Sequence, residues 1–337
     1  MSNKKLTRNL SRIALILVIP VAAFAVMELA CLASGTVLFG KASTWQLFFR
    51  GLTFVSLLAF GVSINMHSGR FDFSTGAVML ISSVIGAKLA FEMKLGPVMM
   101  LVIAGASGML FGAVVGGLYV LLNLPPMIIG LGCTLVFEGL VAIITNGLKP
   151  VRFGADPSYF NFMLSPVNMI ILLAGALLLM VIAFSFTRFG YDYRALQSGQ
   201  GIAVNTGTRE KRNAFICYVI AGLMFGLAGA VSLAGKNGIT PTINFSSIAS
   251  MFACFLPLFF SDFISRYCNK QLAIVLGCVA YEFIQIGFGQ ISFAKAFFTP
   301  DVYKVVEAFI LVLFLIYLNN QNKLKPLFTR KKTEAET

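Results

Sequence analysis

The chain has 337 residues, of which 58% are hydrophobic and only 12% are charged. Soluble domains carry roughly a quarter of charged residues, and no soluble core of this size could hide so much apolar surface. The composition therefore excludes a soluble enzyme and indicates an integral membrane protein. The net charge of +13 does not require a nucleic acid partner, because the basic residues lie between apolar runs, where the positive-inside rule explains them.

Ten apolar segments, each near the ~20 residues that cross a bilayer, follow one another along the chain. They lie near residues 13–35, 45–65, 75–93, 97–122, 127–147, 167–186, 214–235, 247–263, 271–290 and 302–318. We therefore predict an all-α polytopic membrane protein with about ten transmembrane helices. One transmembrane domain would cover residues 1–318, followed by a basic tail at 319–337. Hydropathy leaves open whether some helices are broken or re-entrant.

The distribution of lysine and arginine predicts which side of the membrane each loop faces. With both termini in the cytoplasm, 17 of the 26 basic residues fall in cytoplasmic segments. We therefore expect the N-terminus and the C-terminus in the cytoplasm. The longest cytoplasmic segment is then the loop 187–213, whose helix-compatible stretches are broken by Gly199, Gly201 and Gly207. The residues alone leave open whether this loop is basic only for topology or docks a soluble partner.

The segment NMHSGRFDFSTG, residues 65–76, is polar and lies between two membrane-length runs. It holds the only histidine, His67, and has no second ligand type beside it except Asp72, so we expect no metal site. Asp72 or Ser74 is expected to cap the following helix, whose first amides lipid cannot satisfy. The six cysteines contain no CxxC pair and are expected as small buried residues.

Two acidic residues lie inside membrane-length segments, where burying a charge is costly. Glu138 is in the middle of the fifth segment and Glu282 is in the middle of the ninth. They could line a polar pathway or a proton relay, or they could be hydrogen-bonded inside the bundle and fix helix register. The residues favour the second interpretation without excluding the first.

Glycines at four-residue spacing occur in two of the segments and predict that each of these helices packs closely against a neighbouring helix. Gly108, Gly112 and Gly116 lie on the fourth segment, and Gly222 and Gly226 lie on the seventh. The pattern predicts a compact bundle. It leaves open whether these glycines form a seam, that is, a close helix–helix contact, within one chain or also between two copies of the chain.

A weak similarity joins the two halves of the chain. Residues 68–76, SGRFDFSTG, and residues 259–270, FFSDFISRYCNK, are both short polar loops with serine, aspartate and arginine between apolar segments. We therefore predict two pseudo-repeated halves. Such repeats are common in transporters, where the solute path runs between the halves.

Several sequence signatures of enzymes are missing. The chain has no GxxxxGK[ST] phosphate loop, no HExxH and no GxSxG. ATP hydrolysis by that loop and the corresponding metalloprotease and esterase chemistries are therefore not expected. Transport or channel function remains as the leading class, followed by a membrane scaffold without transport.

Three segments resemble one family of transporters. GRFDFSTGAVMLISS (69–83) resembles a GGIDLSVG stretch followed by an apolar helix, and LNLPPMIIGLGCTLVFEGL (122–140) resembles a segment with the motif PPFIATLG. Residues 189–231 resemble the loop FGRxxxAxGGNxxAA and its following helix. These features are typical of the permease subunits of ribose- and galactose-type ABC importers, which belong with the branched-chain amino acid permeases. The match extends loosely over residues 45–318.

The resemblance implies a permease subunit of an ATP-binding-cassette importer in the bacterial plasma (inner) membrane, which moves a small polar solute such as a sugar. It implies an ABC ATPase docked from the cytoplasm, an extracytoplasmic solute-binding protein, and a second permease subunit, with two different permeases slightly favoured over two identical ones. The chain itself would be no enzyme and bind no cofactor, since the partner ATPase would use the ATP.

The resemblance also assigns residues to roles. The loop 187–213 would couple to the ATPase through Ala195, Ser198, Gly199, Gln200, Ala203 and Gly207. The first-half signature and the membrane acids would form a translocation path of Phe71, Asp72, Phe73, Glu138 and Glu282. The alternative is an ion-coupled secondary transporter in which the two glutamates carry protons.

The chain departs from the family pattern at three places. Arg70 stands where the second glycine of GGIDLSVG is usual, and Gln200 and Gly201 stand where acids usually follow GGN. Residues 255–270 replace the glycine-rich stretch GGTSLAGGKG of the second half. Because glycine permits close approach of backbones, bulkier residues at these positions indicate a divergent path or the less typical member of a permease pair.

Overall fold

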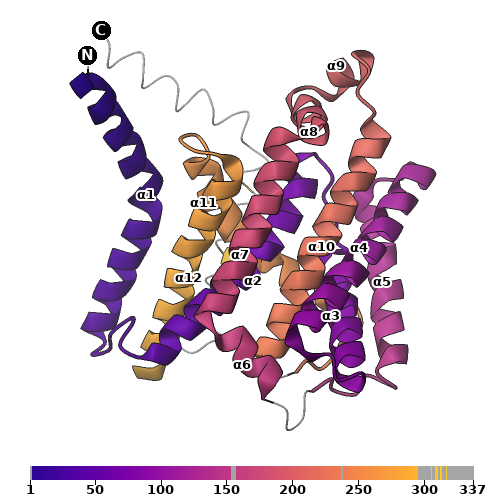
Figure 1. Ribbon diagram of the computed structural model, residues 1–337, viewed down its shortest axis with the longest axis horizontal. Coiled ribbons are helices and arrows are strands. Elements are labelled where there is room, and N and C mark those ends of the chain that lie inside the picture. The colour runs from indigo at the N-terminus through magenta and orange to yellow at the C-terminus, as the bar shows by residue number, and fades with distance from the viewer. Residues whose placement is uncertain are drawn as a thin grey trace.

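A computed structural model shows the chain as a bundle of long helices (Figure 1). The structure describes residues 2–152, 157–236 and 238–294, with single positions at 305, 308, 309, 312 and 316. In this part of the chain, nine helical segments are long and apolar enough to cross a membrane. The β-structure within the same residues is one isolated bridge between Val151 and Ile239. The predicted all-helical membrane fold is therefore confirmed.

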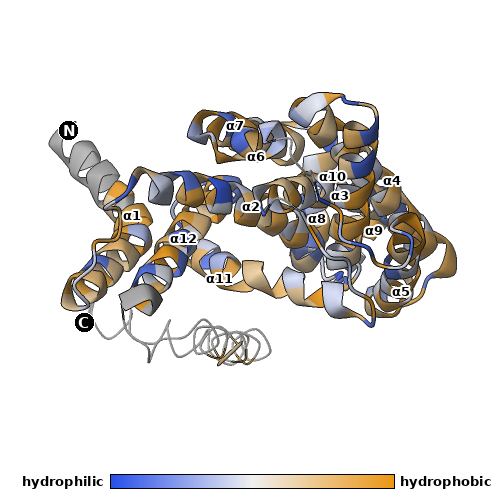
Figure 2. Ribbon diagram, turned by 90° about the horizontal axis from the view of Figure 1, so that it is seen from below, coloured by the Kyte–Doolittle hydropathy of each residue, from blue (hydrophilic) through white to orange (hydrophobic). Residues whose placement is uncertain are grey.

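The helices follow the predicted apolar segments closely. The membrane-length elements are α1 (Ser2–Ala33), α2 (Ala42–His67), α3 (Thr75–Glu92), α4 (Gly96–Leu122), α5 (Pro126–Ile144), α7 (Pro166–Val181) continued by the π-helix η1 (Ile182–Phe186), α10 (Glu210–Gly235), the 3-10 helix η2 (Ser246–Cys254) continued by α11 (Phe255–Ile264), and α12 (Lys270–Ala294). Three shorter helices are α6 (Ser158–Leu164), α8 (Arg188–Ser198) and α9 (Gln200–Asn205). Hydrophobic residues run along most of their length (Figure 2). The tenth predicted segment, 302–318, and the tail, 319–337, lie outside the described residues apart from those single positions.

Local sequence explains where the helices turn. Asn123 ends α4 in the left-handed conformation, with φ of 51°, which asparagine tolerates better than most residues. Two prolines follow, and Pro126 occupies the first turn of α5, where its missing N–H costs no hydrogen bond. The result is a three-residue connection between two antiparallel membrane helices.

The predicted glycine seam is the contact between α4 and α10. A Cβ atom on Gly108 would lie 2.2 Å from the carbonyl oxygen of Gly222, and one on Gly226 would lie 2.1 Å from that of Ala104. The two backbones therefore touch, as small residues allow in lipid. The seam lies inside one chain.

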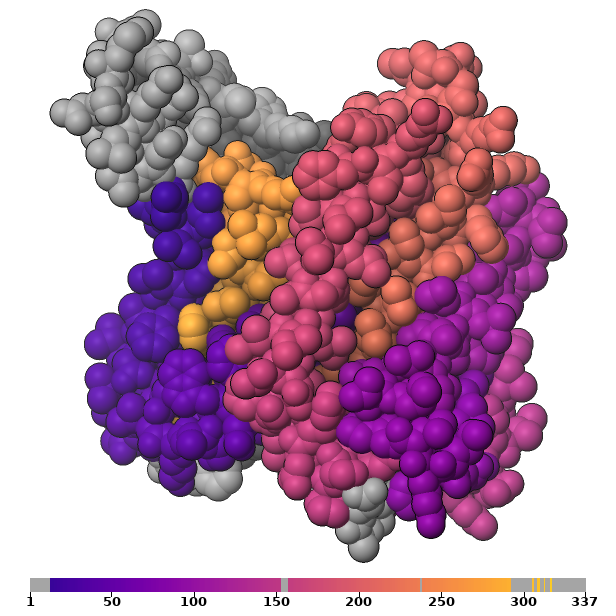
Figure 3. Space-filling view, viewed as in Figure 1, coloured from indigo at the N-terminus to yellow at the C-terminus, as the bar shows by residue number. Residues whose placement is uncertain are grey.

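The two ends of the bundle differ. The helices α8 and α9 project from one end, which is also the end where α1 begins (Figures 1 and 3). At the edge of the bundle α1 packs on α12 and exposes apolar side chains such as Val26 and Leu29. Such a surface is suited to lipid or to another membrane helix.

Candidate functional site

The chain between α2 and α3 is held by a buried carboxylate. Asp72 is 6% exposed. One of its oxygens accepts the backbone N–H of Ser74 at 2.8 Å, and the other accepts the Ser74 hydroxyl at 2.7 Å. Asp72 therefore fixes Ser74, the residue directly before α3, by a turn rather than by the expected cap, since the Ser74 side chain accepts no hydrogen bond from the helix amides.

The chain before η2 is held in the same way, by a carboxylate from another helix. Glu138 on α5 is 1% exposed, and its Oε2 accepts the backbone N–H of Phe245 at 2.9 Å. Its Oε1 accepts the N–H of Ser247 at 3.0 Å and the Ser247 hydroxyl at 2.6 Å. Both carboxylate oxygens are thus engaged at the start of a helix, where negative charge is favourable.

The backbone that Glu138 holds is strained. Asn244 and Phe245 have φ of 66° and 62°, and each residue in this left-handed region costs about 1–2 kcal/mol. Phe245 is bulky and gains nothing locally from this conformation. Strain of this kind persists only where surrounding contacts enforce it, and it is concentrated at functional sites.

One face of α5 holds both helix starts. Gly130, Thr134 and Glu138 are spaced by four residues and so share a face. The Thr134 hydroxyl donates to the carbonyl oxygen of Phe73 at 3.1 Å, and a Cβ on Gly130 would lie 2.7 Å from the Phe73 nitrogen. The starts of α3 and η2 also touch, because a Cβ on Gly76 would lie 1.8 Å from the Ser247 carbonyl oxygen. We call residues 71–76, residues 243–247 and these three α5 residues the central site.

The second chain segment of the central site, residues 243–247, was not predicted from the sequence. A signal was present, because FDFST at 71–75 and INFSS at 243–247 share a phenylalanine followed by serine at matching places. Both stretches lead from irregular chain into a membrane helix. This correspondence relates the two halves of the chain more closely than the predicted pairing of residues 68–76 with 259–270.

The two loops of that predicted pairing nevertheless meet. The Nε2 of His67 lies 3.2 Å from an Asp262 carboxylate oxygen, and its Nδ1 lies 2.8 Å from the Ser63 carbonyl oxygen. His67 thus joins the end of α2 to the end of α11. Within the described residues no group of three His, Cys, Asp or Glu side chains could hold a metal ion.

The remaining residues of the predicted translocation path lie at two separate places in the structure. Phe71 stacks on Phe255 of α11, with ring centroids 5.9 Å apart, and touches the edge of Phe73. Glu282 lies elsewhere, against Gly51 near the start of α2, about 21 Å along that helix from Asn65. The structure therefore brings Glu138 together with Phe71, Asp72 and Phe73 and leaves Glu282 apart.

Arg70 is buried next to the central site. It is 5% exposed, its Nη1 atom has no hydrogen-bond partner, and its guanidinium lies 6.0 Å from the ring centre of Tyr119. Ionised groups in lipid are rare and costly. The position that departs from the family pattern is thus a buried, incompletely paired cation.

The predicted coupling residues lie on the projecting helices. Ala195 and Ser198 are on α8, Gly199 separates α8 from α9, and the remaining three lie on or just after α9: Gln200, Ala203 and Gly207. Ala203 is 4% exposed and its carbonyl oxygen accepts the Thr208 N–H at 3.0 Å. The neighbouring Ile202 is 75% exposed, and this residue had not been predicted.

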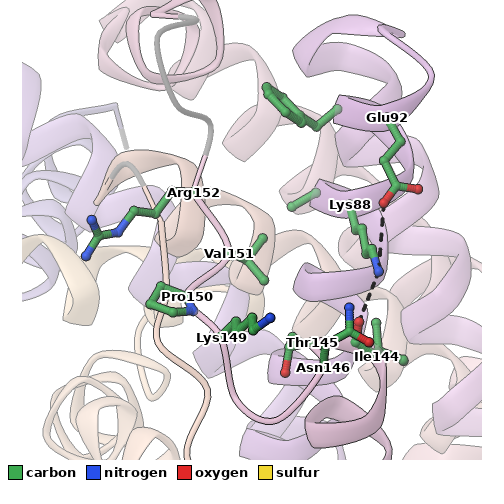
Figure 4. A pocket seen from close by; sticks show the side chains of 11 residues that line it. Lys88, Glu92, Ile144, Thr145, Asn146, Lys149, Pro150, Val151 and Arg152 are labelled. Atoms are coloured by element: carbon green, nitrogen blue, oxygen red, sulfur yellow. Dashed lines mark hydrogen bonds and ion pairs between the residues drawn. The ribbon is translucent and has the colours of Figure 1, made fainter.

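The chain that leads to α6, at the end of the bundle opposite α8 and α9 (Figure 1), lines a basic cavity (Figure 4). The cavity has a volume of about 220 Å³ and is lined by the ends of α3 and α5 and by residues 145–152. Lys88 donates to the Ile144 carbonyl oxygen at 3.0 Å and lies 3.8 Å from Glu92. Lys149 extends toward Thr145. With Arg152, three cations and one acid line the cavity.

Known proteins resemble most of this chain. Residues 46–315 match the family described as the branched-chain amino acid transport system / permease component. The D-allose transport system permease protein AlsC of Escherichia coli is 30% identical over 176 residues, which cover 50% of this chain and 53% of that protein. The ribose import permease protein RbsC of Bacillus subtilis is 26% identical over 191 residues, covering 55% and 59%. The autoinducer 2 import system permease protein LsrC of Photorhabdus luminescens is 26% identical over 208 residues, covering 59% and 60%.

The aligned parts thus span little more than half the length of these relatives, whereas the family match covers most of the present chain. The fold agrees with that match, since nine membrane-length helical segments occur in the described residues. The chain belongs to the permease family of the branched-chain amino acid transport systems, among relatives that include sugar importers.

Proposed function

We propose that this chain is a membrane-spanning subunit of an ATP-driven importer for a small polar solute, a sugar or sugar-like molecule. The family supports the importer class, and the printed functions of the relatives, D-allose, ribose and autoinducer 2 import, support the solute class. The residues of the central site, Phe71, Asp72, Phe73 and Glu138, would border the path of the solute.

The pair α8 and α9 is the observation that carries this proposal. It stands beyond the bundle (Figure 3) and exposes Ile202 and Val204, which are 75% and 43% exposed. Ile202 would become buried if a partner protein covered this end of the molecule, and that burial would stabilise the complex. A cytoplasmic ATPase would bind α8 and α9, so the end of the bundle that carries these two helices would face the cytoplasm.

The remaining partners follow from the same orientation. The basic cavity would then face outward in the bacterial plasma membrane, where an extracytoplasmic binding protein delivers the solute. A second permease, which we propose to be a different chain rather than a second copy, would complete the pore within the lipid. The chain would bind no cofactor, and the ATPase would use the ATP.

Reconstitution tests the proposal directly. Proteoliposomes that contain this chain, its co-encoded ATPase and permease partner, and the binding protein should accumulate labelled solute when ATP is enclosed with the ATPase. Dissipating the proton gradient should leave uptake unchanged. Uptake that survives without the ATPase and collapses with the gradient would instead support the ion-coupled alternative.

Replacing Ile202 with aspartate should reduce uptake roughly tenfold while the protein stays in the membrane. Burying such a side chain contributes about 1.5–3 kcal/mol, and 1.4 kcal/mol corresponds to tenfold in binding. The measurement is uptake together with co-purification of the ATPase. Ile202→Leu is the matched control and should behave like the native chain. Normal uptake by Ile202→Asp would contradict docking through α9.

Replacing Lys149 with glutamate should raise, by several-fold, the concentration of binding protein needed for half-maximal uptake. The change reverses one of the charges that would attract acidic side chains of that protein. The defect should shrink at high salt, which screens such contacts. Lys94, exposed and outside the cavity lining, offers the control Lys94→Glu. A Lys149→Glu variant with unchanged concentration dependence would exclude the cavity as a docking site.

A further inference from the structure

The last turn of α2 receives a hydrogen bond from the projecting helix α8. The carbonyl oxygens at a helix end lack partners within the helix and need other donors. The Ile64 carbonyl oxygen accepts the Tyr193 hydroxyl at 2.9 Å, from 129 residues away in the chain, and also the Ser68 hydroxyl at 2.9 Å. Tyr193 therefore caps α2 from outside.

Tyr193 is suited to transmit force, because its ring cannot turn freely. The side chain is 6% exposed and packs edge-on against Phe184, with ring centroids 4.9 Å apart. Two other hydrogen bonds tie α8 to its neighbours in the chain: Arg194 donates to the Phe184 carbonyl oxygen of η1, and Asn213 of α10 donates to the Phe189 carbonyl oxygen. Among these three hydrogen bonds, the one from Tyr193 joins α8 to α2.

The end of α2 leads directly into the central site. The Arg70 N–H donates to the Asn65 carbonyl oxygen at 2.9 Å, so the linker folds back on the turn that Tyr193 caps. Two residues later, Asp72 holds the start of α3. A displacement of α8 would therefore move the linker through one hydrogen bond and a short, folded stretch of chain.

We propose that Tyr193 is a positioning residue that transmits movement of the α8–α9 pair to the end of α2 and so to the central site. This inference rests on the proposed function, in which an ATPase moves that pair. Tyr193 touches no solute and no nucleotide in this scheme; its hydroxyl acts through the Ile64 carbonyl oxygen.

Tyr193→Phe tests the inference, because it removes the hydroxyl and retains the ring. In the reconstituted importer, the solute transported per ATP hydrolysed should fall at least fivefold, while the rate of ATP hydrolysis and the amount of assembled complex stay unchanged. Tyr191→Phe is the matched control: Tyr191 lies on the same helix, is 60% exposed, and should give the native ratio.

Two outcomes would overturn the inference. An unchanged ratio in Tyr193→Phe would show that the hydroxyl transmits nothing, and a parallel loss of uptake and ATP hydrolysis would show a merely structural role. Failure of the native complex to import with ATP would instead refute the proposed function, so that measurement comes first.

Hydrogen–deuterium exchange supplies a second measurement, which can be made on the native complex even if the Tyr193→Phe variant does not assemble. Backbone amides of residues 68–74 in the native complex should exchange at a different rate with bound ATP than without nucleotide. In Tyr193→Phe that difference should shrink to a small fraction. Identical exchange in the native complex with and without ATP would overturn the inference, even if the variant did not assemble.

Discussion

Replacing Glu138 with alanine is expected to cost about 3 kcal/mol or more of the folding free energy. Glu138 accepts the backbone N–H groups of Phe245 and Ser247 and the Ser247 hydroxyl. Each buried donor left without a partner costs about 1–3 kcal/mol, and lipid supplies no water to replace the carboxylate. The strained backbone at Phe245 would also lose the contact that holds it. Thermal unfolding of the purified protein in detergent measures the loss.

Two milder variants give the expected order of effects. Glu138→Gln keeps one oxygen as an acceptor and should lose less stability than Glu138→Ala. Ser247→Ala removes one donor and leaves both backbone bonds, so it should lose less still. Glu92→Gln, at a largely exposed acid, is the control and should change nothing. Equal stability of Glu138→Ala and the native chain would contradict the assigned contacts.

The same variants separate the two transport mechanisms. If Glu138 carried protons, Glu138→Gln would abolish uptake, because an amide cannot titrate. If Glu138 anchors the second helix start, Glu138→Gln should retain a substantial part of ATP-driven uptake. The engagement of both carboxylate oxygens by backbone and hydroxyl donors favours the anchor. Glu282 packs against Gly51 of α2, about 21 Å along that helix from Asn65, and makes none of the hydrogen bonds of this anchor.

The membrane helices could be predicted because their signal is local. A run of about 20 apolar residues specifies a spanning helix in lipid whatever its neighbours are, and the nine segments up to residue 290 match the structure within a few residues. The break between α8 and α9 was also local, since the predicted interruption at Gly199 is where α8 ends.

The central site could be predicted only in part because its contacts are distant in sequence. The hydrogen bonds between Asp72 and Ser74 span two residues and lie within one motif of the sequence. The bonds from Glu138 to Phe245 and Ser247 span more than 100 residues. By hydropathy, the η2–α11 segment does not differ from any other apolar run. The composition therefore predicts neither the 3-10 helix at its start nor the left-handed residues before it.

Replacing Gly222 with alanine should destabilise the protein by about 3 kcal/mol, the upper end of the usual cost of overpacking. The new Cβ would lie 2.2 Å from the Gly108 carbonyl oxygen and 3.0 Å from the Cα of Gly112. Both obstacles are backbone, so α4 and α10 must separate along their whole contact. Because α10 also packs on α2 and α3, uptake should fall with stability. Thermal unfolding and uptake of the same preparation measure both effects.

Gly117→Ala separates steric overlap from helix propensity. Gly117 lies on α4, as Gly108 does, but a Cβ there would meet nothing within 4 Å. Alanine is intrinsically better than glycine inside a helix by up to about 1 kcal/mol, so this variant should be as stable as the native chain or slightly more stable. The two glycine-to-alanine changes should therefore have opposite signs. Equal effects would mean that α4 and α10 do not touch through their backbones.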